Sequence, residues 1–192
     1  MPKTLSPADI ENFRARLCDV AEKQFAAHGP DGVTMRELAD ALGVSSMTPY
    51  RYFKDKDSIL AAVRTRAFNR FAEAMEGAHS KSDSGNAYLD FALANPAAYR
   101  LMFDVNQPTF GDYPELVAAM HRARLTMGDG LRLLAAAGRF KGDVEVAAHV
   151  FWSTMHGAVM LELAGLLDGS NLDARQIARP ALQALAKHFE IG

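Results

Sequence analysis

The spacing of apolar residues is the feature that most limits how this 192-residue chain can fold. Between glycines and prolines, apolar side chains recur every three to four positions, which gives an α-helix one apolar face. Ile10, Phe13 and Leu17 begin such a face near the N-terminus. No alternating run is long enough to predict a strand, and no repeat of fixed period is evident. The sequence therefore predicts an all-α fold.

Capping residues mark where the expected helices begin and end. Ser6 before a proline and an acidic residue is typical of a helix N-terminus, and Thr34 with Glu37 has the spacing of a capping box. Gly43 stands where a helix would stop. Pro180 lies inside the last predicted helix, so we expect a kink or a late start there. The predicted helices span about 7–28, 34–42, 45–53, 57–78, 86–94, 96–105, 114–137, 143–168 and 173–190.

The stretch GVSSMTPYRYFKDK, residues 43–56, is too polar for a core and too aromatic for an ordinary solvated helix. It follows a short helix whose expected inner face is Leu38, Ala41 and Leu42. Two short helices joined by a tight turn and braced by a longer one form a helix-turn-helix pattern. The second helix of such a pair enters the DNA major groove, which explains the mixed composition.

Side chains around this stretch suit contacts with DNA. Ser46 and Thr48 can hydrogen-bond to base edges, and Met47 can touch a thymine methyl group. Arg51 can pair with guanine or with a phosphate, and neighbouring hydroxyl and basic groups suit the phosphate contacts that fix register. Taken singly, each of these residues is more often a cap or a packing residue. The DNA-binding candidates are Thr34, Arg36, Ser45, Ser46, Met47, Thr48, Tyr50, Arg51, Tyr52, Lys54 and Lys56.

Charge and composition set further limits. The net charge is −2, and residues 1–60 hold eight Lys or Arg against nine Asp or Glu, so a DNA-binding face must come from local sorting of charge. Cys18 is the only cysteine, so no intrachain disulfide can form. The N-terminus lacks the apolar core of a secretory signal, and the longest uncharged run, 146–161, is too short for a bilayer. We expect a cytoplasmic protein with no membrane segment.

The order of residues is more specific than their periodicity. The segment DGVTMRELADALGVSSMTPYRYFKDKDSIL, residues 31–60, resembles the DNA-binding domain of the TetR/AcrR family of transcriptional regulators. The family pattern is a capped Thr followed by Arg, then L-A-x-x-L-G-V-S, T-x-Y-x-x-F and K-x-x-L, the last with one extra residue here. The resemblance covers roughly residues 8–60. It implies base-facing roles for Ser46, Met47, Thr48 and Arg51, and phosphate contacts for Thr34, Arg36, Tyr50, Tyr52 and Lys56.

Three positions depart from the family pattern. Met47 stands where glycine is frequent, Pro49 where leucine is frequent, and Tyr52 where histidine is frequent. Pro49 is still expected to face inward. The changes at Met47 and Tyr52 leave the operator sequence undetermined.

Two motifs in the second half carry another resemblance. NPAAYRLMF (95–103) and WSTMHGAVMLEL (152–163) resemble the ligand-binding domain of a TetR subgroup marked by a Trp and a His-Gly pair. This implies a DNA-binding domain at 1–60, a connecting helix at about 57–78 and a ligand-binding and dimerisation domain at 79–192. The small, polar residues 77–85 independently predict a loop and a domain boundary there. The homodimer would form through the last two helices. It would read a palindromic operator in double-stranded DNA.

Soft and aromatic residues in the larger domain are candidates for a pocket that takes a small hydrophobic effector. His156 and Glu162 could orient it, and few cations fall inside the apolar stripes, which favours a neutral or cationic ligand. Each candidate fits an ordinary core just as well. The ligand-binding candidates are Phe91, Tyr99, Met102, Phe103, Phe110, Met120, Met127, Trp152, Met155, His156 and Met160.

Other classes of function are less consistent with the sequence. His149 and His156 share a helix, but a zinc or di-metal site needs tighter sets of ligands. No nucleophile elbow and no phosphate-binding glycine loop is present. We therefore predict no enzyme activity, no cofactor and no metal. The alternative that stays open is a DNA-binding protein without an effector, whose larger domain serves dimerisation or protein contacts.

Overall fold

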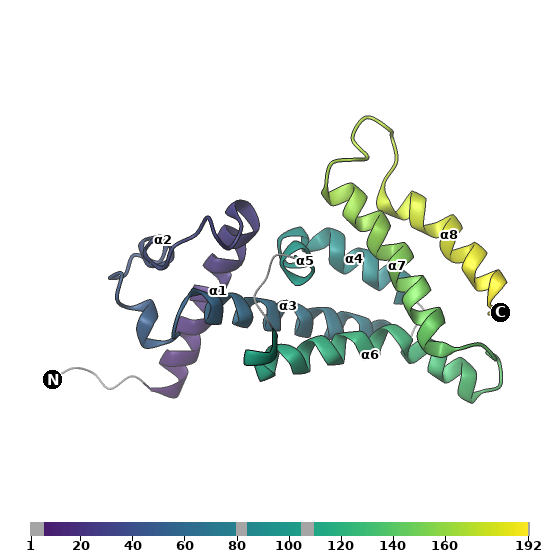
Figure 1. Cartoon of the computed structure of the whole chain (residues 1–192), viewed down its shortest axis with the longest axis horizontal. Coiled ribbons are helices and arrows are strands. Elements are labelled where there is room, and N and C mark those ends of the chain that lie inside the picture. Colours follow the sequence, from purple (N-terminus) through teal and green to yellow (C-terminus); the bar gives the residue numbers. More distant parts are fainter. Residues whose placement is uncertain (1–5, 80–83, 105–109, 192) are drawn as a thin grey trace. The chain divides into compact units, whose positions relative to one another are not determined.

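The computed structural model describes residues 6–79, 84–104 and 110–191, and every regular element within them is helical (Figure 1). The all-α prediction is confirmed. None of the helices in these residues is long and apolar enough to cross a membrane. The elements are α1 Pro7–His28, α2 Met35–Ala41, the 3-10 helix η1 Pro49–Arg51, α3 Lys56–His79, α4 Ser84–Ala94, α5 Pro96–Met102, the 3-10 helix η2 Phe110–Asp112, α6 Pro114–Ala136, α7 Val144–Leu163 and α8 Ala174–His188.

The helices pack into two compact units. The first comprises Met1–Phe68 with Ala97–Ala119, and the second comprises Asn69–Pro96 with Met120–Gly192. Both α3 and α6 contribute residues to each unit. The predicted functional division at residues 60 and 79 stays a prediction, because the packing of helices and the division of function are separate properties.

The predicted caps of the first two helices are present. Ser6 and Asp9 form a reciprocal capping box at the start of α1, with Asp9 N donating to Ser6 Oγ over 3.1 Å. Thr34 and Glu37 do the same for α2. Gly43 ends α2 with a φ of +67°, a left-handed conformation that glycine adopts without strain.

One detail of the inner face of α2 was wrong in the prediction. Leu38 is fully buried and Leu42 is half-buried, but Ala41 is exposed. Ala39 is buried instead, because Met35, Leu38 and Ala39 are the residues of α2 that face the core.

The core of the first unit joins α1, α2 and α3. Leu17 and Phe25 of α1 pack in one cluster with Leu38 of α2 and Ile59 of α3, all of them almost inaccessible to solvent. Arg66 of α3 adds polar links to α1, donating to the carbonyl of Ala15 over 2.9 Å and to Asp19 Oδ1 over 2.7 Å. These links fix α1 against the first half of α3.

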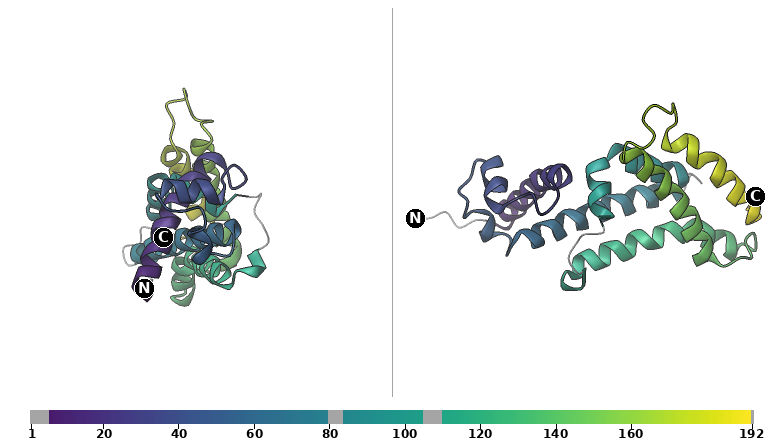
Figure 2. Two further views of the ribbon diagram at one scale, coloured as in Figure 1. Left: turned by 90° about the vertical axis from the view of Figure 1, so that its left-hand side faces the viewer. Right: turned by 45° about the horizontal axis from the view of Figure 1, so that its top comes forward.

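The second unit is built around α7, which packs against α4 and α8 (Figures 1 and 2). Phe71 of α3 meets the rings of Tyr88 and Phe91 edge to face, at centroid distances of 5.4 and 5.3 Å. The Trp152 indole donates a hydrogen bond of 3.0 Å to the hydroxyl of Tyr88. A buried hydroxyl is thus satisfied by the tryptophan that marks the second sequence motif.

The ends of α7 and α8 differ from the prediction. α7 stops at Leu163 rather than 168, because Gly165 takes a φ of +71° and the N–H of Leu166 bonds back to the carbonyl of Leu161 over 3.0 Å. α8 shows no late start. It begins at Ala174 and continues through Pro180, an exposed position.

The loop predicted at 77–85 is shorter in the structure. Residues 77–79 belong to α3, and residues 84 and 85 belong to α4. Residues 80–83 lie outside the described part, as does residue 105 of the helix predicted at 96–105.

Candidate DNA interface and ligand cavity

The recognition segment, residues 43–56, is tighter than predicted. In place of an α-helix to residue 53, it contains a turn followed by the single 3-10 turn η1, Pro49–Arg51. Pro49 has no N–H to donate to the carbonyl of Ser45, and its ring would crowd that carbonyl in an α-helix. The N–H of Thr48 donates to this carbonyl instead, over 2.8 Å.

The outer side of the recognition segment carries three of the four residues proposed to contact bases, Ser46, Met47 and Arg51, while the fourth, Thr48, is half-buried. Met47 is 67% exposed and Tyr50 is 49% exposed, although both are large and partly apolar. Ser46 and Arg51 are exposed beside them. A large apolar side chain held in water on a short, rigid turn has no packing role in the monomer, so this side is available to a partner.

The inner side of the segment is anchored. Pro49 and Phe53 are buried, as the prediction for Pro49 required. The Tyr52 ring stacks on Phe13 of α1, with centroids 4.2 Å apart. Arg14 donates to the carbonyl of Tyr52 over 2.6 Å. These contacts hold the segment in one orientation, which is a condition for reading a base sequence.

The candidates for phosphate contacts differ in how their polar groups are used. Thr34 is exposed but engages Glu37 in the capping box. Arg36 is exposed, with a loose ion pair to Asp40 at 3.7 Å, and Lys54 is exposed. Lys56 is half-buried and donates to the carbonyl of Pro30 over 2.5 Å. Arg36 and Lys54 are therefore the cations of this set that lie open to a phosphate.

The second unit contains a cavity of about 820 Å³. It is bounded by residues of α3, α4, α6, α7 and α8, together with the residues that follow α6 and α8. Most of its wall is apolar, including Met75, Leu89, Leu131, Leu134 and Phe151. Its volume falls within the range of about 300–1,000 Å³ usual for small-molecule sites.

The predicted ligand-binding residues are scattered rather than gathered. Met127 and Met155 line the cavity. Tyr99, Met102 and Phe103 belong to the first unit instead. Within the second unit, Phe91 is in the core, Met120 and His156 are half-buried outside the cavity wall, and Met160 is exposed. The side chain of Phe110 lies outside the described part.

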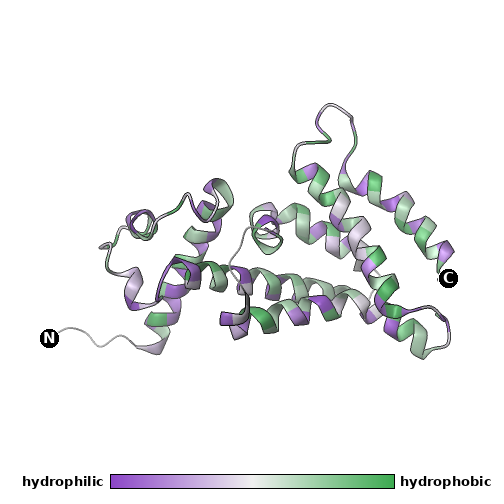
Figure 3. Cartoon of the chain, in the orientation of Figure 1, coloured by the Kyte–Doolittle hydropathy of each residue, from purple (hydrophilic) through white to green (hydrophobic). Residues whose placement is uncertain are grey.

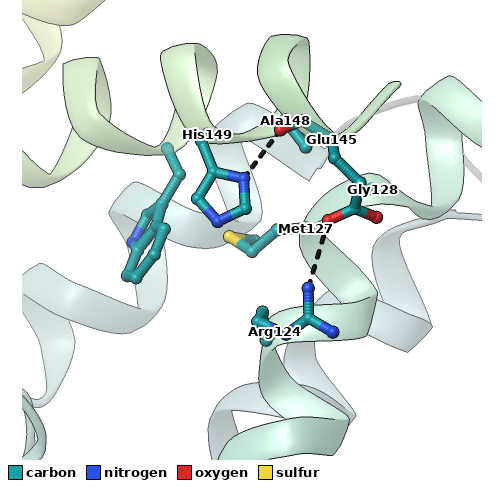
Figure 4. A pocket seen from close by; sticks show the side chains of 7 residues that line it. Arg124, Met127, Gly128, Glu145, Ala148 and His149 are labelled. Atoms are coloured by element: carbon teal, nitrogen blue, oxygen red, sulfur yellow. Dashed lines mark hydrogen bonds and ion pairs between the residues drawn. The ribbon is translucent and has the colours of Figure 1, made fainter. Parts of the chain in front are cut away.

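Trp152 borders a different and much smaller recess of about 10 Å³, shown in Figure 4. Here Arg124 pairs with Glu145 over 3.1 Å, and His149 Nδ1 lies 2.7 Å from the carbonyl of Glu145. A space of this volume holds at most one water molecule. The recess is a polar helix contact and not a ligand site.

His156 and Glu162, which the sequence suggested could orient a ligand, both make contacts within the fold. Burial lowers the pKa of His156, whose ring contacts Trp152. Glu162 Oε2 accepts a hydrogen bond of 2.6 Å from the N–H of Ala174, the first residue of α8. Glu162 therefore caps a helix, a role that sequence spacing gave no sign of. Within the described residues, no group of three or more His, Cys, Asp or Glu side chains is placed to hold a metal ion.

The first unit holds a helix-turn-helix segment with an exposed side that can read bases, and the second holds a cavity. This combination is typical of DNA-binding transcriptional regulators. Residues 17–63 match the family described as bacterial regulatory proteins, tetR family. Residues 82–185 match the tetracyclin repressor-like C-terminal domain. The chain belongs to the TetR family of transcriptional regulators.

One relative and two solved structures illustrate what the chain is similar to. An uncharacterized HTH-type transcriptional regulator of Mycobacterium tuberculosis is 29% identical over 153 residues, covering 76% of this chain and 68% of that protein. A solved protein with unknown function from Rhodococcus sp. RHA1 has a TM-score of 0.80 at 26% identity, covering 99% of both chains. PfmR, a TetR family transcriptional regulator from Thermus thermophilus, shares the fold, with a TM-score of 0.69 at 20% identity over 90% of this chain and 97% of that one.

Proposed function

We propose that the protein is a dimeric, sequence-specific repressor that a small hydrophobic effector releases from its DNA operator. The observation that carries the effector part is the cavity of about 820 Å³ in the second unit. The cavity is mostly apolar and open to solvent, and a contiguous apolar hollow of this kind usually marks a binding site. The cavity thus favours this function over that of an effector-independent DNA-binding protein.

In this proposal, the recognition segment contacts the DNA bases. Arg51 and Ser46 supply polar groups for base edges, and Met47 supplies an apolar surface for a thymine methyl group. Arg36 and Lys54 are the exposed cations for phosphates. Because residues 1–60 carry no excess of positive charge, these few cations must account for most of the electrostatic attraction.

Dimerisation is proposed through α7 and α8. The outer face of α7 carries Val146, Met160 and Leu161, which are 56%, 37% and 40% exposed. Gly157 lies between them in sequence, with no atom within 4 Å of the position that a Cβ would occupy. Small and apolar residues on one exposed face suit a symmetric contact with the same face of a second copy. Two recognition segments would then read a palindromic operator.

Coupling between effector and DNA is assigned to α3. Met75, near the end of this helix, lines the cavity, while Arg66, on the same helix, bonds to the backbone of α1. An effector that binds better to a state with α3 displaced would draw the recognition segments away from the operator spacing. The shift is limited by the difference in effector affinity between the two states.

The first experiment is selection of bound sequences from a random duplex pool with the purified protein. The expected result is an inverted repeat whose half-sites are about one helical turn, ~34 Å, apart. No enrichment at low salt would contradict the DNA-binding assignment. Transcription from a promoter that overlaps the selected operator then separates repression, which we expect, from activation.

A further inference from the structure

The charged residues on the cavity wall have one sign. Arg139, Arg175 and Arg179 line it, and no acidic residue does so within the described part of the chain. The sequence favoured a neutral or cationic ligand, because few cations fall inside the apolar stripes. The fold changes this expectation, since it adds arginines from α8 and from the segment that follows α6.

The cations and the apolar wall are ordered along α8. Arg175, Arg179, Leu182, Gln183 and Ala186 line the cavity, and their spacing of four, three, one and three positions places them on one face of the helix. Among these lining residues, the two arginines occupy the first turns, and Leu182, Gln183 and Ala186 occupy the later turns. Over the whole helix, polar and apolar segments alternate along the ribbon, as expected for an amphipathic helix (Figure 3). Along α8 the wall residues therefore change from cationic to mostly apolar, while Arg139 adds a third cation from the segment that follows α6.

The two arginines of α8 are held differently. Arg175 pairs with Asp90 of α4 over 2.5 Å, which compensates much of its charge. For Arg179, no hydrogen bond or ion pair occurs within the described residues, and its position is exposed. An exposed guanidinium at the edge of an apolar cavity can bind a carboxylate or phosphate in a bidentate pair while the anion stays partly hydrated.

We propose that the effector is an amphipathic anion, with a carboxylate or phosphate head group on an aliphatic chain. The head group pairs with Arg179, with Arg175 close to it on the same face. The chain lies against Leu131, Leu134 and Phe151. This assignment of ligand class rests on the proposed effector-responsive function and specifies the chemistry of that same cavity.

The test compares head groups on one chain length. Dodecanoate, dodecyl phosphate and dodecyltrimethylammonium are titrated below their micelle concentrations, and dodecanol below its solubility limit, with binding followed by calorimetry. At least one anion should bind about tenfold or more tightly than the alcohol and the cation. The anion that binds more tightly shows whether the effector carries a carboxylate or a phosphate ester. Shortening the chain of that anion should weaken binding roughly fourfold for each methylene removed.

Two variants test the assigned residue. Arg179→Gln should reduce the affinity of the preferred anion about tenfold and leave dodecanol binding unchanged. Lys187→Gln removes the same charge from the same helix at an exposed position outside the cavity wall, so it should change neither. Equal binding of the anions, alcohol and cation to the unmodified protein would overturn the inference, and so would an anion preference that Arg179→Gln leaves intact.

The same ligands are then added to the complex with the selected operator. Release by dodecanol as readily as by the anions would leave the effector-responsive repressor standing and reject the anionic ligand class. Selective binding of an anion that depends on Arg179 but causes no release would confirm the ligand site and contradict the proposed release mechanism. The proposed release mechanism and the proposed ligand class are therefore contradicted by different results.

Discussion

Arg14 Nη1 lies 2.6 Å from the carbonyl oxygen of Tyr52 and donates a hydrogen bond to it, across 38 residues of sequence. The same guanidinium is centred 4.2 Å from the centroid of the Phe53 ring. One half-buried side chain of α1 thus supports the inner side of the recognition segment through a charged donor and a cation–π contact. The segment is only a turn and one 3-10 helix, so its orientation depends on such external support.

We expect Arg14→Gln to lower operator affinity about tenfold and the free energy of unfolding by about 1–3 kcal/mol, because a partly buried carbonyl loses its charged donor. Fluorescence anisotropy of an operator duplex and chemical denaturation measure the two effects. Arg16→Gln removes the same charge from an exposed position of α1 and should do neither. Equal losses in both variants would show that α1 acts through charge alone.

The sequence predicted those features that depend on neighbouring residues. Ser6 and Thr34 cap their helices as expected, because each cap bonds to an N–H only three positions away. The Arg14–Tyr52 contact joins residues that nothing in the local pattern relates. Pro49 was predicted to lie near the start of an α-helix, where a missing N–H is tolerated, but the segment forms only a 3-10 turn there.

Arg51 and Lys54 should behave differently on DNA although both are exposed cations. Arg51→Ala should reduce discrimination between the operator and its single-base variants by about 1–3 kcal/mol at one position. Lys54→Ala should weaken all duplexes to a similar extent and reduce the slope of log affinity against log salt by about 1. Binding isotherms on a set of operator variants at several salt concentrations measure both. If the effects of the two variants were interchangeable, the docking of this segment would be wrong.

Gly157 tests the proposed dimer. An added side chain meets no atom within 4 Å in the monomer, so Gly157→Leu should leave the fold intact and favour the helix, since glycine is the weaker helix former. On the proposed face it would hold two copies apart, and sedimentation should show a monomer with much weaker operator binding. Gly77→Leu, on an exposed position of α3 that is equally open, should stay dimeric. A dimeric Gly157→Leu protein would place the dimer contact elsewhere.

The cavity was harder to predict than the helices. Methionine and aromatic residues at helical spacing fit a core and a pocket equally well, and only packing decided that Met127 and Met155 line the cavity while Phe91 fills the core. In the local sequence, nothing distinguishes Arg175 and Arg179 from ordinary solvated charges of a helix. Their place at the cavity depends on how α8 is rotated against α7, which Glu162 helps to set by bonding to the N–H of Ala174. No periodicity in one helix contains that information.

His156 should make stability depend on pH in a defined direction. Burial lowers its pKa, so the unfolded chain binds more protons than the folded one between the lowered pKa and the usual value near 6.5. The contribution of neutral, buried His156 to the free energy of unfolding should therefore be fully present above about pH 6.5 and be lost as the pH drops through the folded-state pKa. Denaturation midpoints measured from about pH 8 to about pH 5, at fixed protein concentration, should fall less for His156→Gln than for the unmodified protein. His149→Gln replaces an exposed histidine of the same helix and should keep the original loss, whereas an unchanged pH profile in His156→Gln would show that His156 becomes protonated without cost to the fold.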